Sequence, residues 1–204
     1  MKGLLLKDYF TLLKQLRFYL IFLLIFTIIP NMNLSSIAIV YAAMLPITVI
    51  AYDERSKWDQ LAAMMPYSKR ELVFSKYLLG YIGVAIFSVI TLVLQVTVGL
   101  IGKSGFSAEQ AMTILVTAAA ALILLAINLP FMFWLGVERG RVVFMIIIGV
   151  TVFLGMMSAD SAKNLIANQT ITASQLIVLS GAVTIIANFV SILISGKIYR
   201  KKKI

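Results

Sequence analysis

The sequence predicts an all-α, polytopic membrane protein with six transmembrane helices, and three observations support this class. Hydrophobic residues make up 61% of the 204 residues. Charged residues make up only 13%, about half of the fraction found in an ordinary soluble domain. Long uncharged stretches alternate with short basic segments. Six helices of about 20 residues would occupy about 120 residues, so no soluble domain of ordinary size fits beside them. We therefore expect a single transmembrane domain over residues 1–204.

The first element expected is an amphipathic helix over residues 1–17 that lies in the membrane interface. Its predicted apolar face consists of Leu5, Tyr9, Leu12 and Leu16, which recur at helical spacing. In the open alternative, these residues extend the first membrane span.

The uncharged stretches mark the spans. A turn signal at residues 30–33, Pro-Asn-Met-Asn, separates the first two spans in a tight hairpin. A five-span alternative, in which residues 18–51 form one re-entrant hairpin, stays open. The predicted spans cover residues 15–30, 34–51, 74–101, 110–135, 142–158 and 175–196.

Three of the predicted helices have the spacing of a capping box at their start. In this motif a hydroxyl accepts a backbone hydrogen bond near the helix start, and a Glu or Gln three residues later reaches back. The pairs are Ser68–Glu71, Ser107–Gln110 and Thr172–Gln175.

The basic residues predict the orientation of the chain. All of them except Lys103 and Lys163 lie in residues 1–17, 52–76, 138–141 and 197–203. These four segments alternate with the spans, and positive residues stay cytoplasmic. We therefore expect both termini in the cytoplasm. Topology explains the net charge of +10, so nucleic acid is not an expected partner.

The sequence contains no Cys and no His. It therefore lacks a thiolate nucleophile, the commonest metal ligand and the commonest general base. The acidic residues all fall in predicted loops or at helix edges, whereas intramembrane proteases and ion-driven pumps keep ionisable groups inside the membrane. Gly102-Lys103-Ser104 lacks the earlier Gly of a phosphate loop, because residue 97 is Thr. We expect no catalytic residue, no metal and no cofactor bound by this chain.

The longest predicted cytoplasmic loop, residues 52–70, carries the best candidate site. Trp58, Leu61, Ala62 and Met65 would share the apolar face of a short helix, and Pro66 would end it. Acidic residues would occupy the start of this helix, where they complement its dipole; they are Asp53, Glu54 and Asp59. The apolar face fits either the lipid headgroup layer or a groove on a cytosolic partner.

Neutral polar residues are expected within the spans. Gln95, Asn128 and Asn188 could line a substrate path, or could form hydrogen bonds between helices, which is the usual role of lone amides in bundles. Residues 118–121 are four consecutive alanines and favour close helix packing.

At the 52–70 loop the chain resembles the small permease subunits of ABC-2-type ABC exporters. The basic amphipathic start and the six spans with both ends inside are similar over the whole chain. The most specific residues are Tyr52-Asp53-Glu54, Trp58-Asp59, Met65-Pro66-Tyr67-Ser68-Lys69-Arg70 and Lys76-Tyr77. The chain looks most like compact permeases that export amphipathic peptides, such as phenol-soluble modulins, or that confer immunity to antimicrobial peptides.

This resemblance implies a partner and a location. The loop would be a coupling helix that docks in a cleft of a separate ABC ATPase, and that ATPase would bind ATP and Mg. A second permease, identical or related, would complete the pathway in a bacterial cytoplasmic membrane. The implied docking residues are Asp53, Glu54, Arg55, Trp58 and Asp59, to which Leu61 and Met65 add the apolar face.

We therefore expect the permease subunit of an ATP-driven exporter that moves amphipathic peptides or similar hydrophobic compounds. Two alternatives stay open. A substrate-capture subunit of the vitamin-uptake type would bind a small molecule without the ATPase, and would dock through small-residue faces such as Ala118–Ala121. A passive channel or scaffold would act without nucleotide.

Overall fold

The computed structural model describes residues 3–13, 21, 35–101, 108–167 and 173–201. The regular structure in these ranges is α-helical without strands, which confirms the all-α class. Besides the helical residues 3–13, the elements are α2 (Ser35–Ala42), α3 (Leu45–Arg55), α4 (Trp58–Ala63), α5 (Lys69–Ile101), α6 (Ala108–Ala167) and α7 (Ala173–Lys201).

Three described stretches are long and apolar enough to cross a membrane: Lys69–Leu100, Gln110–Ile147 and Ser180–Lys201. The predicted first span, at residues 15–30, lies almost wholly outside the described residues. The count of six spans and the placement of both termini in the cytoplasm therefore stay predictions.

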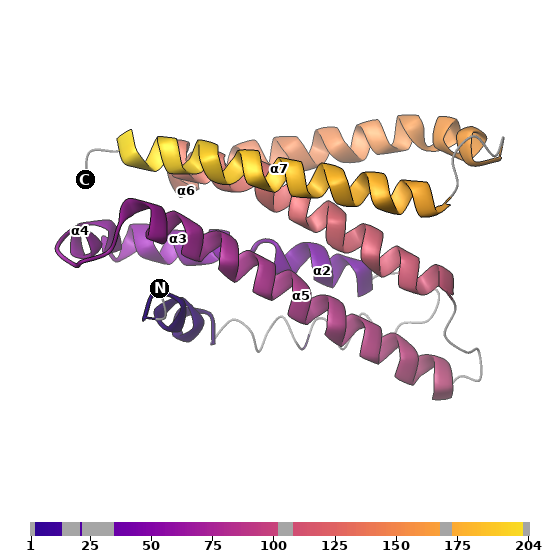
Figure 1. The fold of residues 1–204 in the computed structure, drawn as a ribbon, viewed down its shortest axis with the longest axis horizontal. Coiled ribbons are helices and arrows are strands. Elements are labelled where there is room, and N and C mark those ends of the chain that lie inside the picture. The colour runs from indigo at the N-terminus through magenta and orange to yellow at the C-terminus, as the bar shows by residue number, and fades with distance from the viewer. Residues whose placement is uncertain (1–2, 14–20, 22–34, 102–107, 168–172, 202–204) are drawn as a thin grey trace.

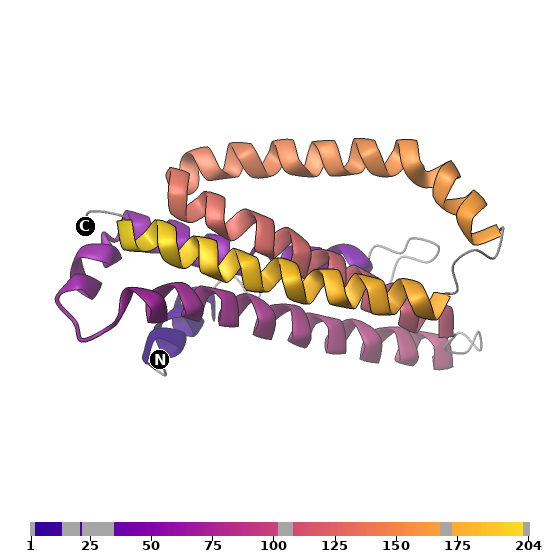
Figure 2. The same cartoon turned by 45° about the horizontal axis from the view of Figure 1, so that its top comes forward.

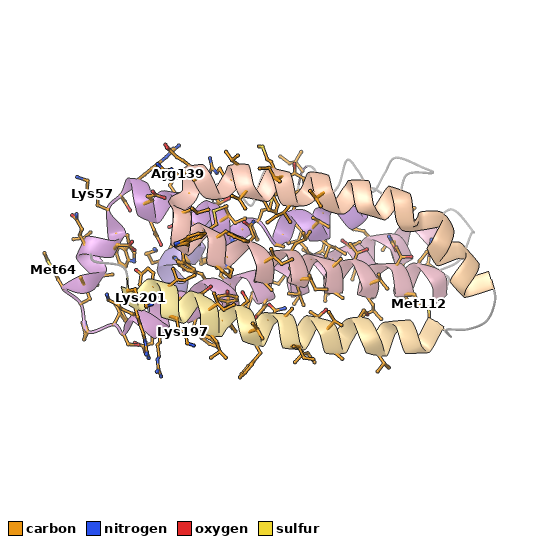
Figure 3. The ribbon with its side chains drawn as sticks, turned by 90° about the horizontal axis from the view of Figure 1, so that it is seen from above. Lys57, Met64, Met112, Arg139, Lys197 and Lys201 are labelled. Atoms are coloured by element: carbon orange, nitrogen blue, oxygen red, sulfur yellow. The ribbon has the colours of Figure 1, made fainter. Side chains whose placement is uncertain are left out.

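The long helices α5, α6 and α7 run along one axis, with α2 and α3 packed beside them (Figure 1). The helical residues 3–13, α4 and the end of α7 gather at one end of this bundle (Figures 1 and 2). Figure 3 places Lys57, Arg139, Lys197 and Lys201 at that end and Met112 near the other. We call the end with these four basic residues the basic end of the bundle.

Helix α6 is two arms joined by a sharp break. Gly136 has φ 78° and ψ 175°, a backbone conformation that is open essentially only to glycine. The second arm folds back along the long axis from this residue (Figure 2). The sequence predicted separate spans with a loop at 138–141, whereas the structure makes the reversal at Gly136 and keeps residues 137–167 helical.

The predicted continuous span 34–51 is wrong at its centre. Residues 43–44 form a turn between α2 and α3, and Pro46 stands at the start of α3. Proline has no N–H to donate and its ring clashes with the carbonyl of the preceding turn. It is instead favoured in the first turn of a helix, so a new helix begins there although the hydropathy continues unchanged.

Of the three predicted capping boxes, the structure describes the one at the start of α5. The capping box of α5 is confirmed: the Glu71 carboxylate accepts from the backbone N–H of Ser68 at 2.9 Å, and the Ser68 hydroxyl accepts from the N–H of Glu71 at 3.2 Å. The other two boxes involve Ser107 and Thr172, which lie outside the described residues.

The helical residues 3–13 bury one face inside the protein, and this face includes Leu12 of the predicted apolar set. Leu4, Asp8 and Leu12 are buried, whereas Tyr9 is 51% exposed. The hydropathy pattern did not place an aspartate on the inner face, and a lysine of α5 compensates its charge there, as described below.

Helices α3, α5 and α6 pack closely against one another at Gly80. A Cβ atom on Gly80 of α5 would overlap the Leu125 side chain of α6 and would lie 3.0 Å from the Pro46 ring of α3. Leu125 is 1% exposed. This contact fixes α3, and therefore the segment that follows it, against the long helices.

Candidate functional site

The α4 segment turns away from α3 at the basic end of the bundle. Lys57 joins the two helices in the left-handed conformation, with φ 52°, which is uncommon for a residue other than glycine. Helix α4 is only six residues long. The expectation that Asp53, Glu54 and Asp59 all stand at the start of one short helix is therefore wrong. Asp53 and Glu54 belong to the last turn of α3, and only Asp59 lies in the first turn of α4.

The apolar side chains of this segment divide between two faces. Ala62 is 1% exposed and belongs to the core, and Trp58 packs against the same core. Leu61, Met64 and Met65 point outward, with Met64 85% exposed. The four residues predicted to share one face are therefore divided: Trp58 and Ala62 pack against the core, whereas Leu61 and Met65 are exposed. The exposed apolar surface consists of Leu61, Met64 and Met65.

The acidic residues of the segment hold it against the long helices. Asp59 accepts a hydrogen bond of 2.9 Å from the hydroxyl of Tyr199 on α7. Glu54 accepts one of 2.9 Å from the backbone N–H of Val137, directly after the break in α6. These two hydrogen bonds connect the segment to α6 and α7.

Four charged side chains form a closed ring beneath α4. Lys76 of α5 lies 2.8 Å from Asp8 and 2.7 Å from Asp53. Lys7 lies 2.9 Å from Asp8 and also pairs with Asp53. The two positive and two negative charges balance, and the Asp8 side chain is 1% exposed. Burial of charge in a protein requires such pairing, so the ring fastens residues 3–13 to α3 and α5.

Lys7 also reaches α4, because its Nζ atom lies 4.4 Å from the centre of the Trp58 ring. This is a cation–π distance. Beside it, Trp58, Asp59, Lys76 and Tyr199 line a cavity of about 40 Å³, which has room for water.

A second polar system runs between the long helices. The Tyr77 hydroxyl lies 2.5 Å from the hydroxyl of Ser191 and 2.8 Å from that of Ser195. One turn further along α5, the Tyr81 hydroxyl donates to Asn188 Oδ1 at 2.9 Å. Asn188 Nδ2 donates to the Leu122 carbonyl of α6 at 3.3 Å. These bonds join α5, α6 and α7.

The three predicted path residues are therefore not equivalent. Asn188 forms hydrogen bonds between helices, which is the role that the sequence left open as the alternative to lining a substrate path. Asn128 is 3% exposed, and its Oδ1 has no partner among the described residues. Gln95 lies 14 residues beyond Tyr81 on α5, about 21 Å along the helix, so it is not brought together with Asn188.

Sequence reasoning missed the groups that support α4, namely Lys7, Asp8, Lys76 and Tyr199. Asp8 was the one acid in a basic tail, and Lys76 stood inside an apolar helix. An isolated acid and an isolated lysine, each on the apolar face of a helix, could have indicated that Asp8 and Lys76 form an ion pair. Likewise, Tyr77/Tyr81 and Ser191/Ser195 each have i, i+4 spacing, which puts each pair on one helix face. Within the described ranges, no group of three or more His, Cys, Asp or Glu side chains could hold a metal ion.

The comparisons with known proteins agree with a membrane transport role. A family model described as ABC-2 family transporter protein matches residues 3–200, nearly the whole chain. Neither the curated proteins nor the solved structures give a match.

Proposed function

Because the chain belongs to the ABC-2 transporter family, and is thus a membrane-embedded permease that works with an ABC ATPase, we propose that it is the permease subunit of an exporter. The ATPase is a separate polypeptide that binds ATP and Mg, and a second permease completes the pathway. The proposed location is a bacterial cytoplasmic membrane with both termini inside. The proposed cargo is an amphipathic peptide or a similar hydrophobic compound.

One observation carries the docking part of this proposal: three large apolar side chains are exposed together at the basic end, namely Leu61 of α4 and Met64 and Met65, which directly follow α4. Met64 is 85% exposed. Methionine is flexible and polarizable, and suits a groove on a protein partner. The ATPase would cover this surface, while Trp58 and Ala62 keep the helix attached to the permease.

The connections of α4 support a route for the motion. A push on α4 would reach α7 through Asp59 and Tyr199, and would reach the break in α6 through Glu54 and Val137. The charge ring would carry it into α5 through Lys76. A gate formed by these helices could therefore respond to the ATPase without any ionisable relay at the membrane centre.

The proposal is tested by purifying the tagged chain from its native membrane in a mild detergent and identifying what accompanies it. We expect an ATPase with a phosphate-loop motif in equal amount. A Leu61→Asp/Met64→Asp variant should insert normally and lose this ATPase. The control is Met112→Asp, which places a single added carboxylate near the opposite end (Figure 3) and should keep the ATPase.

A chain that is purified alone would favour the channel or scaffold alternative. Retention of the ATPase by Leu61→Asp/Met64→Asp would remove the docking role of this surface while leaving the family assignment intact.

A further inference from the structure

A groove between the start of α5 and the end of α7 lies at the basic end of the bundle. It encloses about 510 Å³, within the range of ligand pockets in proteins. Its apolar lining includes Val73 and Phe74 of α5 and Ile192 and Leu193 of α7. The two helix ends are joined by a hydrogen bond of 3.4 Å from Lys69 Nζ to the carbonyl of Arg200.

Three cations border this apolar groove: Arg70, Lys197 and Arg200. All three side chains are exposed. In the part of the chain that the structure describes, none of them forms an ion pair with a carboxylate. The groove therefore offers unpaired positive charge beside an apolar slot.

One acid, Glu71, also borders the groove. Its carboxylate accepts hydrogen bonds from the Ser68 backbone N–H at 2.9 Å and from the Ser68 hydroxyl at 3.0 Å. It is thus engaged at the start of α5, and three positive charges face one negative charge. The balance favours an anionic ligand.

We propose that the groove binds one anionic phospholipid, with its phosphate between Arg70 and Arg200 and one acyl chain along the apolar lining. Guanidinium groups bind phosphate oxygens in a forked geometry, and basic pockets between membrane helices bind anionic headgroups. The groove lies at the ends of the candidate spans Lys69–Leu100 and Ser180–Lys201, where a lipid headgroup would lie if these helices cross the membrane. The site is independent of the ATPase docking and of the cargo.

Topology alone also places basic residues at the ends of spans, so the test must separate a built site from general surface charge. The full-length chain is purified, stripped of lipid with detergent, and mixed with palmitoyl-oleoyl phosphatidylglycerol or with phosphatidylcholine of the same chains. Native mass spectrometry then counts bound lipid. We expect one retained phosphatidylglycerol and little phosphatidylcholine.

Two independent variants probe the two halves of the site. Arg70→Gln/Arg200→Gln should lower phosphatidylglycerol retention about tenfold, whereas Lys57→Gln/Arg139→Gln, with the same change in net charge at the same end (Figure 3), should not. Gly196→Leu should fill the groove, because a Cβ on Gly196 meets no atom within 4 Å. Gly181→Leu, on the same helix and equally open, is its control.

Equal retention of both lipids, or an equal loss in both charge variants, would show surface attraction only and overturn the site. Unchanged lipid binding in Gly196→Leu would also overturn it, and a simultaneous loss of a dimer signal would assign the groove to a second copy of the chain.

Discussion

The carboxylate of Glu54 accepts a hydrogen bond from the backbone N–H of Val137, 83 residues further along the chain. Val137 is the first residue after the Gly136 break, where a helix has N–H groups without an intrahelical acceptor. Glu54 therefore supplies from α3 the cap that the second arm of α6 lacks in its own sequence. The end of α3 and the reversal of α6 are built as one unit.

The first prediction concerns this cap. Glu54→Ala should lower the free energy of unfolding by about 1–3 kcal/mol, because it removes a charge-assisted hydrogen bond and leaves a part-buried N–H unpaired. Thermal unfolding in detergent measures the change. Glu138→Ala, an exposed acid next to Val137, should stay within about 0.5 kcal/mol. Equal effects of the two variants would show that the cap contributes nothing.

The second prediction concerns the break itself. Gly136→Ala should destabilise the protein by about 1–3 kcal/mol, because φ 78° with ψ 175° is open essentially only to glycine. The added Cβ would also lie 3.2 Å from Glu54 Oε1. Gly149→Ala, in the second arm with no atom within 4 Å of the new Cβ, should instead stabilise by about 0.5–1 kcal/mol. Thermal unfolding in detergent should show changes of opposite sign for the two variants, and changes of the same sign would contradict the role given to Gly136.

The third prediction concerns the charge ring. Lys76→Met leaves the buried carboxylates of Asp8 and Asp53 with Lys7 as their only partner in the ring, and should cost about 3–5 kcal/mol. Asp8→Asn/Lys76→Met removes one charge of each sign and keeps the pair of Lys7 with Asp53.

The double variant should therefore be more stable than the sum of the single variants implies, by at least about 1 kcal/mol. Lys201→Met, an exposed lysine at the same end, is the control. Additive losses in this cycle would mean that the four charges act separately.

Local patterns predicted the helices and the α5 capping box because both depend on residues a few positions apart. They did not predict the ring, in which Lys76 and Asp8 are 68 residues apart. Asp53 and Glu54 were assigned to a loop helix because they precede Trp58 in an exposed-looking charged run. Their partners, Lys7, Lys76 and Val137, come from three other parts of the chain.

The break before Pro46 was missed for a different reason. Hydropathy measures only whether a stretch prefers lipid, and residues 34–51 do. It does not register that proline removes a backbone hydrogen bond from a helix interior and is favoured in the first turn of a new helix. Conversely, the short 138–141 loop was placed within a few residues of Gly136, because its charges end the apolar stretch close to the actual reversal.

The fourth prediction concerns the polar contacts between α5 and α7. Tyr77→Phe removes the hydroxyl that lies between Ser191 and Ser195. It should cost about 1 kcal/mol, since hydrogen bonds between membrane helices contribute modestly. Tyr52→Phe, at a tyrosine that is 43% exposed, should change stability by less than about 0.5 kcal/mol. A loss of several kcal/mol in Tyr77→Phe, or none, would contradict this assignment when both are measured by thermal unfolding.

The fifth prediction separates the two buried asparagines by the same substitution. Asn188→Leu removes bonds to Tyr81, to the Leu122 carbonyl and to the Thr184 carbonyl, and should destabilise by about 1–3 kcal/mol. Asn128→Leu removes an amide whose Oδ1 has no partner among the described residues. It should leave stability unchanged or raise it by about 1 kcal/mol, because burial of an unpaired polar group is unfavourable.

If Asn128 contacts cargo, Asn128→Leu should nevertheless lower peptide-stimulated ATP hydrolysis by the purified complex about tenfold, the value of one lost hydrogen bond of about 1.4 kcal/mol. Asn128→Leu would then keep or gain stability while it loses stimulated ATP hydrolysis. Asn188→Leu would lose both. A stable Asn128→Leu complex with full stimulation would exclude Asn128 from the path. An Asn128→Leu chain as unstable as Asn188→Leu would instead show that its amide holds the bundle together.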